Sequence, residues 1–233
     1  MTSNLVKRFE RNTKGRDLIV PDIHGHFSKV RAALAEVGYS PENGDRLFSV
    51  GDLVDRGPES LEALEFLKTA EAVSGNHEAM AVMWAQDGSR MDSGNYAANG
   101  GGWFMALDRE TQKEIAATFQ SLPVAIEIDT EGGLVGIVHA ECPFDEWSLF
   151  TGALEHLDGR DLDQLIDFAQ WSRNKISAME DSIVSGVRAV VVGHTPMARM
   201  TSLGNTLYID TMGWRGQQFT ILDAATLQPA RKP

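Results

Sequence analysis

Six polar residues of this sequence carry side chains that suit metal ions, and each stands at or just beyond the end of an apolar stretch that reads as a strand. They are Asp22, His24, Asp52, Asn76, His139 and His194. Mixed aspartate, histidine and asparagine donors favour manganese, iron or zinc over calcium or magnesium. Six donors exceed the needs of one ion and predict two ions that share a bridging carboxylate.

Two such ions suit the hydrolysis of a phosphoester. Ions about 3.5–4 Å apart stabilise both the attacking and the leaving oxygen, and they lower the pKa of a bridging water until a hydroxide nucleophile exists near neutral pH. The leaving alkoxide needs a proton, and His77, beside the ligand Asn76, is free to act as general acid. Asp55 is the carboxylate expected to fix its tautomer. Arg56 and Arg173 are expected to hold the non-reacting phosphoryl oxygens.

The stretch Gly51-Asp52-Leu53-Val54-Asp55-Arg56-Gly57 organises the first half of the chain. It follows an apolar run at 47–50 and precedes helical spacing over 59–70. Its carboxylates therefore sit on a turn at the end of a strand, where α/β sheets place ligands. Strands at 18–20, 47–50 and 72–73, each followed by a polar turn and a helical segment, predict βαβ units and a parallel sheet. The first helix is expected to begin after Ser28 as its N-cap.

The second half predicts further strands and helices. A glycine-rich, asparagine-rich stretch at 88–103 predicts a long functional loop, and 110–122 predicts a helix. Segments 124–128 and 134–138 predict a hairpin, 145–172 is expected to be mostly helical, and 187–192, 206–209 and 219–222 are expected strands. We expect one α/β domain over residues 1–233, with polar residues 1–15 as a loosely held lead-in.

Bulk composition limits the partners. The 233 residues are 42% hydrophobic and carry a net charge of −12, which argues against a nucleic-acid surface or an anionic membrane as partner. Cys142 is the single cysteine, so an intrachain disulfide is excluded and a reducing, cytoplasmic setting is expected. The sequence contains no apolar run long enough for a bilayer, and residues 1–14 lack the apolar core of a signal peptide.

The ordered motifs of the chain resemble those of the phosphoprotein phosphatase family of metallophosphoesterases, and in particular its bacteriophage lambda phosphatase-like branch. The three leading motifs are Asp22-Ile23-His24-Gly25, the 51–57 stretch and Gly75-Asn76-His77-Glu78. Supporting segments are Asn99–Phe104, His139–Glu146, Gly193–Pro196 and Tyr208–Thr211. Together they span about Val20 to Thr211.

This resemblance implies a metallophosphoesterase fold of two mixed β-sheets in a sandwich flanked by helices, with a dinuclear site at the strand ends. It implies two divalent ions, with manganese expected in vitro and iron or zinc as alternatives. The resemblance implies that Asp22 and His24 bind the first metal, that Asp52 bridges the two metals, and that Asn76, His139 and His194 bind the second. It implies that His77 and Asp55 form the acid pair. It also implies that Arg56, Arg173 and Asn76 contact the substrate phosphate.

Three residues depart from the family pattern. Pro21 replaces the usual glycine before the first metal-binding aspartate and removes a backbone N–H. His26 stands where relatives often have cysteine, and we expect it to fill space. Met212-Gly213 follows Thr211 where relatives usually have glycine directly, so the loop that borders the cleft is expected to differ.

The implied substrate is a phosphorylated protein, with phosphoserine or phosphothreonine first and phosphotyrosine as a further target. Hydrolysis of dinucleoside polyphosphates, on the same fold with the same ligands, is the second enzymatic interpretation. A metal-binding scaffold whose chemistry is weakened by Pro21 is the third.

Overall fold

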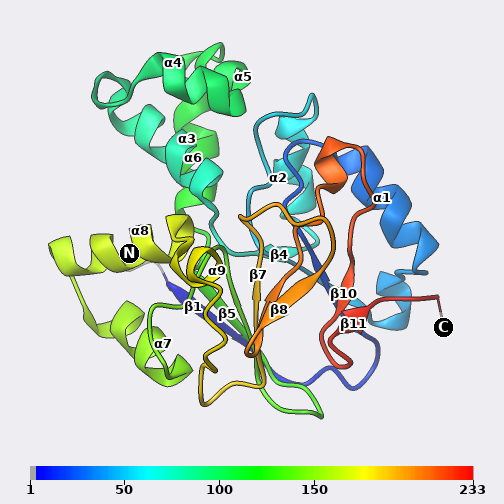
Figure 1. Cartoon of the computed structure of the whole chain (residues 1–233). Helices are drawn as coiled ribbons and strands as arrows, with labels where there is room; N and C mark the ends of the chain where they lie inside the picture. Colours follow the sequence, from blue (N-terminus) through cyan, green and yellow to red (C-terminus); the bar gives the residue numbers. More distant parts are fainter. Residues whose placement is uncertain (1–3, 233) are drawn as a thin grey trace.

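The computed structural model describes residues 4–232 and consists of two β-sheets packed face to face, with helices on both outer sides (Figure 1). The first sheet has the order β1 (Val6–Phe9), β5 (Ala125–Ile128), β6 (Val135–Val138), β7 (Ala189–Val192), β9 (Thr206–Tyr208), β8 (Thr201–Leu203). The second has the order β11 (Gln228–Pro229), β10 (Leu222–Asp223), β2 (Asp17–Val20), β3 (Arg46–Ser49), β4 (Glu71–Ala72). Both sheets mix parallel and antiparallel pairs, so the expected sandwich of mixed sheets is confirmed.

Alternating apolar residues along the strands hold the layers together. Side chains of a strand point to opposite faces in turn, so Leu18 and Val20 of β2 face the helices while Ile19 faces the other sheet. The interior between the sheets is a cluster of aliphatic residues that includes Ile126 and Val191. Burial on both faces explains why these strands read as continuous apolar runs.

The helices cover the outer faces and one end of the sandwich. Near the second sheet lie α1 (Phe27–Glu36) and α2 (Ala63–Phe66), and beside the first lie α7 (Trp147–His156) and α8 (Gly159–Trp171) (Figure 1). A further helical group comprises α3 (Asn76–Asp87), α4 (Ser93–Tyr96), α5 (Gly102–Met105) and α6 (Arg109–Gln120), and the short α9 (Asn174–Ala178) follows α8. Within residues 4–232, no helix has the length and apolarity needed to cross a membrane.

Several expected elements are confirmed. Strands β2, β3 and β4 pair in parallel, and β5 and β6 form the antiparallel hairpin. Segment 145–172 is largely helical as α7 and α8. The carboxyl ends of β2, β3 and β4 therefore lie at one edge of their sheet, as the βαβ pattern predicts.

The expectation of a loosely held lead-in over residues 1–15 is wrong for the part that the structure describes, and residues 1–3 lie outside that part. Val6 is buried, and β1 pairs in parallel with β5. Two basic side chains of β1 also form ion pairs with distant carboxylates. Lys7 lies 2.5 Å from Glu71, and Arg8 lies 2.7 Å from Glu127.

The expected long loop at 88–103 is wrong as well. A 3-10 turn (Gly88–Arg90), α4, a π-helical turn (Ala97–Gly101) and α5 occupy this stretch. Asp92 caps α4 by accepting the backbone N–H of Asn95 at 3.0 Å. Gly100 has φ 102°, which allows the chain to change direction between short helices. The polar composition that suggested a loop therefore supplies caps and a turn.

Smaller differences concern element ends. The 59–70 segment is a 3-10 turn (Ser60–Glu62) followed by the single-turn α2 rather than one helix. Helix α1 begins at Phe27 with His26 as N-cap, not at Ser28. The last expected strand, 219–222, contributes only its final residue to β10, which is Leu222–Asp223.

Candidate active site

The six expected metal ligands meet where strands of the two sheets end. Asp22 and His24 follow β2, Asp52 follows β3, Asn76 begins α3 just after β4, His139 follows β6, and His194 follows β7. All six side chains are buried. Parallel pairing within β2-β3-β4 and between β6 and β7 aligns the strand ends within each sheet, and the packing of the two sheets brings both sets of ends together.

Asp52 and Asn76 connect the donors on the two sides of the site. Asp52 Oδ2 lies 3.6 Å from His24 Nε2, and its Oδ1 lies 3.3 Å from His139 Nε2. Asn76 Oδ1 is 3.0 Å from both His139 Nε2 and His194 Nδ1. Asp22 Oδ2 approaches His24 Nε2 at 4.0 Å. The structure therefore brings all six side chains together.

The three histidines of this set are oriented so that one ring nitrogen faces the other donors. One ring nitrogen of each bonds to a backbone carbonyl; these bonds are His24 Nδ1 to Val54 O at 3.0 Å, His139 Nδ1 to Val50 O at 2.7 Å, and His194 Nε2 to Trp171 O at 3.2 Å. A carbonyl oxygen only accepts, so the bonded nitrogen carries the proton. Metal-ligating histidines are oriented in this way in proteins.

Two donor groups share one carboxylate. His24, Asp52 and His77 form one group, and Asp52, His139 and His194 form the other, with the ligand atoms of each group within 4.8 Å of one another. A carboxylate common to both is the arrangement expected for two ions with a bridge. The first group contains His77 in place of Asp22, whose carboxylate reaches His24 but accepts its hydrogen bonds from the backbone N–H of His194 at 3.1 and 3.0 Å.

The electrostatics of this buried site favour a bound cation. Burial, and then the charges of Asp210 and Asp52, raise the pKa of Asp22 well above its ordinary value. Burial opposes ionisation of Asp52, but His139 and His77 outweigh burial and hold its pKa well below its usual range. Burial lowers the pKa of His139, yet the charge of Asp52 raises it to about 9. Clustered buried carboxylates need positive charge nearby, and divalent ions supply it. The donor set and its charge therefore fit two metal ions.

Unusual backbone conformations concentrate at the site. Three of the proposed ligands have positive φ, with 47° at His24, 52° at Asp52 and 62° at His194. In the 51–57 turn, Asp55 and Arg56 also have positive φ, at 70° and 66°. Such angles cost of order 1–3 kcal/mol each in residues other than glycine. Surrounding contacts must therefore fix these turns.

Glu78, which the sequence analysis gave no role in the site, fixes one of them. Its buried carboxylate accepts the backbone N–H groups of Gly75 and Asp52, both at 2.9 Å, and of Leu53 at 2.8 Å. Burial, and then the charge of Asp52, raise the pKa of Glu78 to about 7. The glutamate three residues after the N-cap Gly75 is the sequence signal of such a helix start.

His77 and Asp55, the residues expected to form the acid pair, are in direct contact. His77 Nδ1 lies 2.7 Å from Asp55 Oδ2, and both residues are fully buried. Its Nε2 points toward the donor cluster, 3.8 Å from Asp52 Oδ2. Trp103 Nε1 donates to the other oxygen of Asp55 at 2.7 Å. No sequence signal identified this tryptophan contact, because it joins the 51–57 turn to the helical group through the tertiary fold.

Arg56 extends over two histidines, His24 and His77. Its Nη1 is 2.7 Å from His24 Nε2, and its Nη2 is 3.0 Å from His77 Nε2. Gly100 packs against its backbone, since a Cβ there would lie 2.2 Å from Arg56 N. The guanidinium is therefore directed at the donor cluster, where a phosphoryl group would bind.

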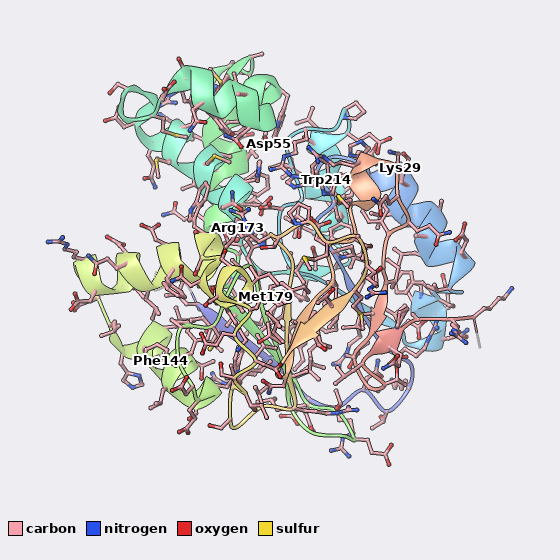
Figure 2. The ribbon with its side chains drawn as sticks, viewed as in Figure 1. Lys29, Asp55, Phe144, Arg173, Met179 and Trp214 are labelled. Carbon is pink, nitrogen blue, oxygen red and sulfur yellow. The ribbon has the colours of Figure 1, made fainter. Side chains whose placement is uncertain are left out.

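Arg173 lies on the opposite side of the site, beside His194. It immediately follows Ser172 at the end of α8, and its Nη2 donates to the carbonyl oxygen of His194 at 3.1 Å. Figure 2 shows it between the helical group and the strand ends. The structure thus brings both expected arginines to the donor cluster, from different elements.

Two departures from the family pattern lie beside the first ligands. Pro21 directly precedes Asp22, and the 23–25 segment is tied to the next turn by backbone bonds from Ile23 N and His24 N to Asp52 O at 3.0 and 2.9 Å. His26 does more than fill space, because its Nδ1 bonds to the carbonyl oxygen of His24 at 2.7 Å. The backbone around His24 is therefore held by its neighbours despite Pro21.

Comparison with known proteins defines the class of protein. A family model described as Calcineurin-like phosphoesterase matches residues 16–207, which is most of the chain. The chain therefore belongs to the calcineurin-like phosphoesterase family and is an enzyme of metal-dependent phosphoester hydrolysis. This family uses a dinuclear divalent metal site, for which the two donor groups sharing Asp52 are the candidate here.

The curated relatives include serine/threonine-protein phosphatases and symmetrical bis(5'-nucleosyl)-tetraphosphatases. Serine/threonine-protein phosphatase 2 of Salmonella typhimurium is 35% identical over 202 residues, covering 83% of this chain and 85% of that protein. A symmetrical bis(5'-nucleosyl)-tetraphosphatase of Aromatoleum aromaticum is 33% identical over 125 residues, covering 52% of this chain and 42% of that protein. A solved serine/threonine phosphatase from Saccharomyces cerevisiae shares the fold, with a TM-score of 0.60 at 17% identity over 87% of this chain and 70% of that one.

Proposed function

We propose that this chain is a protein phosphatase that hydrolyses phosphoserine and phosphothreonine monoesters in proteins. The observation that carries the proposal is the buried His77–Asp55 pair at 2.7 Å, directed at a carboxylate shared by two donor groups. An alkoxide such as that of serine or threonine is a poor leaving group and needs such a proton donor. The 35% identity to the Salmonella typhimurium serine/threonine-protein phosphatase, over an alignment that covers 83% of this chain, supports the same substrate class.

In the proposed division of labour, Asp22 and His24 would hold the first ion and Asn76, His139 and His194 would hold the second. Asp52 would be shared by both ions. Two bound ions supply Lewis acidity and an activated water at neutral pH. We infer manganese as the metal that supports activity in vitro, with iron and zinc also matched to these donors.

The proton and phosphoryl contacts come from the chain itself. Asp55 accepts from His77 Nδ1 and thereby orients the ring, whose Nε2, once protonated and turned to substrate in place of its present contact with Arg56 Nη2, would donate a proton to the leaving oxygen. Arg56, whose Nη2 lies 3.0 Å from that Nε2, and Arg173 hold the non-reacting oxygens, and the amide of Asn76 provides a further contact. Fixed donors around the phosphoryl group stabilise the charge of the transition state. The retained acid pair argues against a scaffold without catalysis.

The cellular setting follows from composition. A net charge of −12 and a single cysteine fit a cytoplasmic enzyme whose partner is a phosphorylated protein rather than nucleic acid or a membrane. We propose that residues 1–233 form a single metallophosphoesterase domain that contains the site.

Hydrolysis of dinucleoside polyphosphates is the second candidate. It is favoured by the match to the Aromatoleum aromaticum tetraphosphatase, which covers 52% of this chain. The match to the protein phosphatase covers a larger share of this chain and of the matched protein. We therefore rank phosphoprotein hydrolysis first.

Direct competition between substrates tests this ranking. The manganese-loaded protein would be given a phosphothreonine peptide and diadenosine tetraphosphate together at equal concentration. The phosphate released from the peptide and the nucleotide products would be quantified. We expect a higher kcat/KM for the peptide. A higher kcat/KM for diadenosine tetraphosphate would reverse the ranking, and His77→Asn in parallel would show whether the acid pair serves the preferred reaction.

A further inference from the structure

Trp214 is an aromatic residue at the donor cluster to which the reaction so far assigns no role. It lies on a 3-10 turn (Gly213–Arg215) in the loop between β9 and β10. Its ring is 4.5 Å from Arg56 Cζ, and its centroid is 4.8 Å from that of the His24 ring, edge to face at 73°. Figure 2 shows Trp214 at the same end of the molecule as Asp55.

The indole is itself held in place from behind. Trp214 Nε1 approaches Asp210 Oδ2 at 3.4 Å, and Asp210 Oδ1 accepts the backbone N–H of Met212 at 2.9 Å. Asp210 is fully buried. Met212 adopts φ 60° and Gly216 φ 98°, so the turn is sharp at both ends. The loop that departs from the family pattern thus presents one aromatic face toward the donor cluster.

Arg56 is the side chain that needs this support. Its residue is exposed, while its guanidinium reaches inward over His24 and His77. An arginine side chain loses considerable rotamer freedom when it is fixed. Stacking of a guanidinium on an indole is favourable and leaves its N–H groups free to donate in the plane.

Trp214 is also poorly explained as a core residue. It is half-buried and belongs to none of the three apolar clusters found among the described residues. Its ring carries a second cation, Arg215, with Cζ 4.9 Å from the centroid. Arg215 is exposed, so its replacement serves as a control that removes a cation from the same ring without changing Arg56.

We propose that Trp214 is a positioning residue that holds the Arg56 guanidinium beside the donor cluster and thereby raises the affinity of the site for a phosphoryl group. The inference rests on the proposed function in one respect, since Arg56 must contact the phosphoryl oxygens. A planar, pre-oriented fork binds phosphate with less loss of freedom than a mobile one.

Binding of inorganic phosphate tests the role without turnover. Calorimetric titration of the manganese-loaded protein would compare wild type with Trp214→Leu, Trp214→Phe and Arg215→Ala, after metal content has been measured for each. Loss of the stacking face in Trp214→Leu is expected to raise the phosphate Kd about threefold to tenfold. Trp214→Phe keeps an aromatic face and is expected to rescue most of the affinity, and Arg215→Ala is expected to change Kd less than about twofold.

A double-mutant cycle shows whether Trp214 acts through Arg56. In an Arg56→Ala background, Trp214→Leu is expected to cause no further loss of phosphate affinity. An equal loss in both backgrounds, or loss of metal from Trp214→Leu, would overturn the proposal by assigning Trp214 to the support of His24.

The proposed function and the role of Trp214 can fail separately. If the wild-type protein binds no phosphate, the phosphoryl site itself is refuted, together with the role of Trp214 in it. If wild type and Trp214→Leu bind phosphate equally, only the role of Trp214 is refuted. If phosphate binds as expected but no phosphopeptide is hydrolysed, the positioning role stands and the substrate assignment falls.

Discussion

Trp103 Nε1 donates a hydrogen bond of 2.7 Å to Asp55 Oδ1, 48 positions earlier in the chain. The other oxygen of the same carboxylate bonds to His77 Nδ1 at 2.7 Å. Asp55 therefore has both oxygens occupied by directed donors, which fixes the plane of its carboxylate and with it the orientation of the His77 ring. The part of the helical group over residues 88–105 contacts the site through this hydrogen bond.

Replacement of Trp103 by phenylalanine tests this orientation. The variant keeps an aromatic ring but removes a hydrogen bond to a carboxylate, a contact worth about 1.5–3 kcal/mol. We expect kcat on a phosphothreonine peptide to fall about tenfold with KM nearly unchanged. The loss should be smaller on p-nitrophenyl phosphate, because p-nitrophenolate leaves without needing a proton.

Trp84→Phe is the matched control, since Trp84 packs against Tyr96 in the same helical group. Its kcat should stay near that of wild type on both substrates. Equal losses on the two substrates in Trp103→Phe would show that Trp103 does not act through the acid pair.

Gly100 and Gly102 predict opposite effects of the same substitution. A Cβ at Gly100 would lie 2.2 Å from Arg56 N, at φ 102°, whereas a Cβ at Gly102 would meet nothing within 4 Å. Gly100→Ala should lower the free energy of unfolding by at least about 1–3 kcal/mol and reduce phosphopeptide turnover. Gly102→Ala lies in helical backbone and should raise that free energy by about 0.5–1 kcal/mol. Urea denaturation with activity assays checks both, and a Gly100→Ala variant as stable and active as wild type would contradict the close packing on Arg56.

Glu78 is expected to support the site through the backbone. Glu78 Oε2 accepts from Gly75 and Asp52 and its Oε1 accepts from Leu53, so Glu78→Gln puts an amide NH2 in place of one of these two acceptors, and a donor cannot satisfy other donors. The free energy of unfolding should fall by about 1–3 kcal/mol, and manganese affinity should fall about 10- to 100-fold because the Asp52 turn loosens. Thermal denaturation and metal titration measure the two effects. Glu114→Gln, on the exposed side of α6, should change neither, and wild-type metal affinity in Glu78→Gln would refute the supporting role.

Asp45 provides a pH-dependent contribution to stability away from the site. Burial raises the pKa of its carboxyl, but hydrogen bonds from Arg16 outweigh burial and hold the pKa below its ordinary value of 3.8. A depressed carboxylate pKa stabilises the fold above the pKa of the unfolded chain and loses that effect as pH falls through the folded value. Asp45→Asn should therefore cost about 1–3 kcal/mol from pH 7 down to about pH 4, with the difference shrinking in more acid solution. Denaturation curves across this range check the trend, and a difference independent of pH would contradict the charge-assisted bonds between Arg16 and Asp45.

Side-chain chemistry and strand patterning were sufficient to predict which donors meet. Asp22, His24 and Asp52 follow apolar runs that form parallel strands, so their common edge follows from local sequence. The same holds for His139 and His194 at the ends of β6 and β7. Strand direction places each set at one end of its own sheet, and the packing of the two sheets then brings the sets together.

Contacts between distant segments could not be predicted in this way. The ion-pair partners of Lys7 and Arg8 in β1 could not be found from local sequence because they lie 64 and 147 positions away, at Glu71 and Glu155. The 88–103 segment looked like a loop because capping residues and glycines, which are typical of loops, also occur in short helices. The contacts of Trp103 with Asp55 and of Trp214 with Arg56 depend on how three separate segments pack, and no local pattern encodes that packing.

The central claim is that two metal ions sharing Asp52 drive hydrolysis of a phosphoprotein. The most direct test is to chelate the wild-type and Asp52→Asn proteins, restore Mn²⁺, and measure bound metal together with phosphate release from a phosphothreonine peptide. We predict two bound ions and metal-dependent release for wild type, and loss of at least one ion with a drop in activity of about 100-fold or more for Asp52→Asn. Equal rates for the two proteins, with manganese present, would contradict the account.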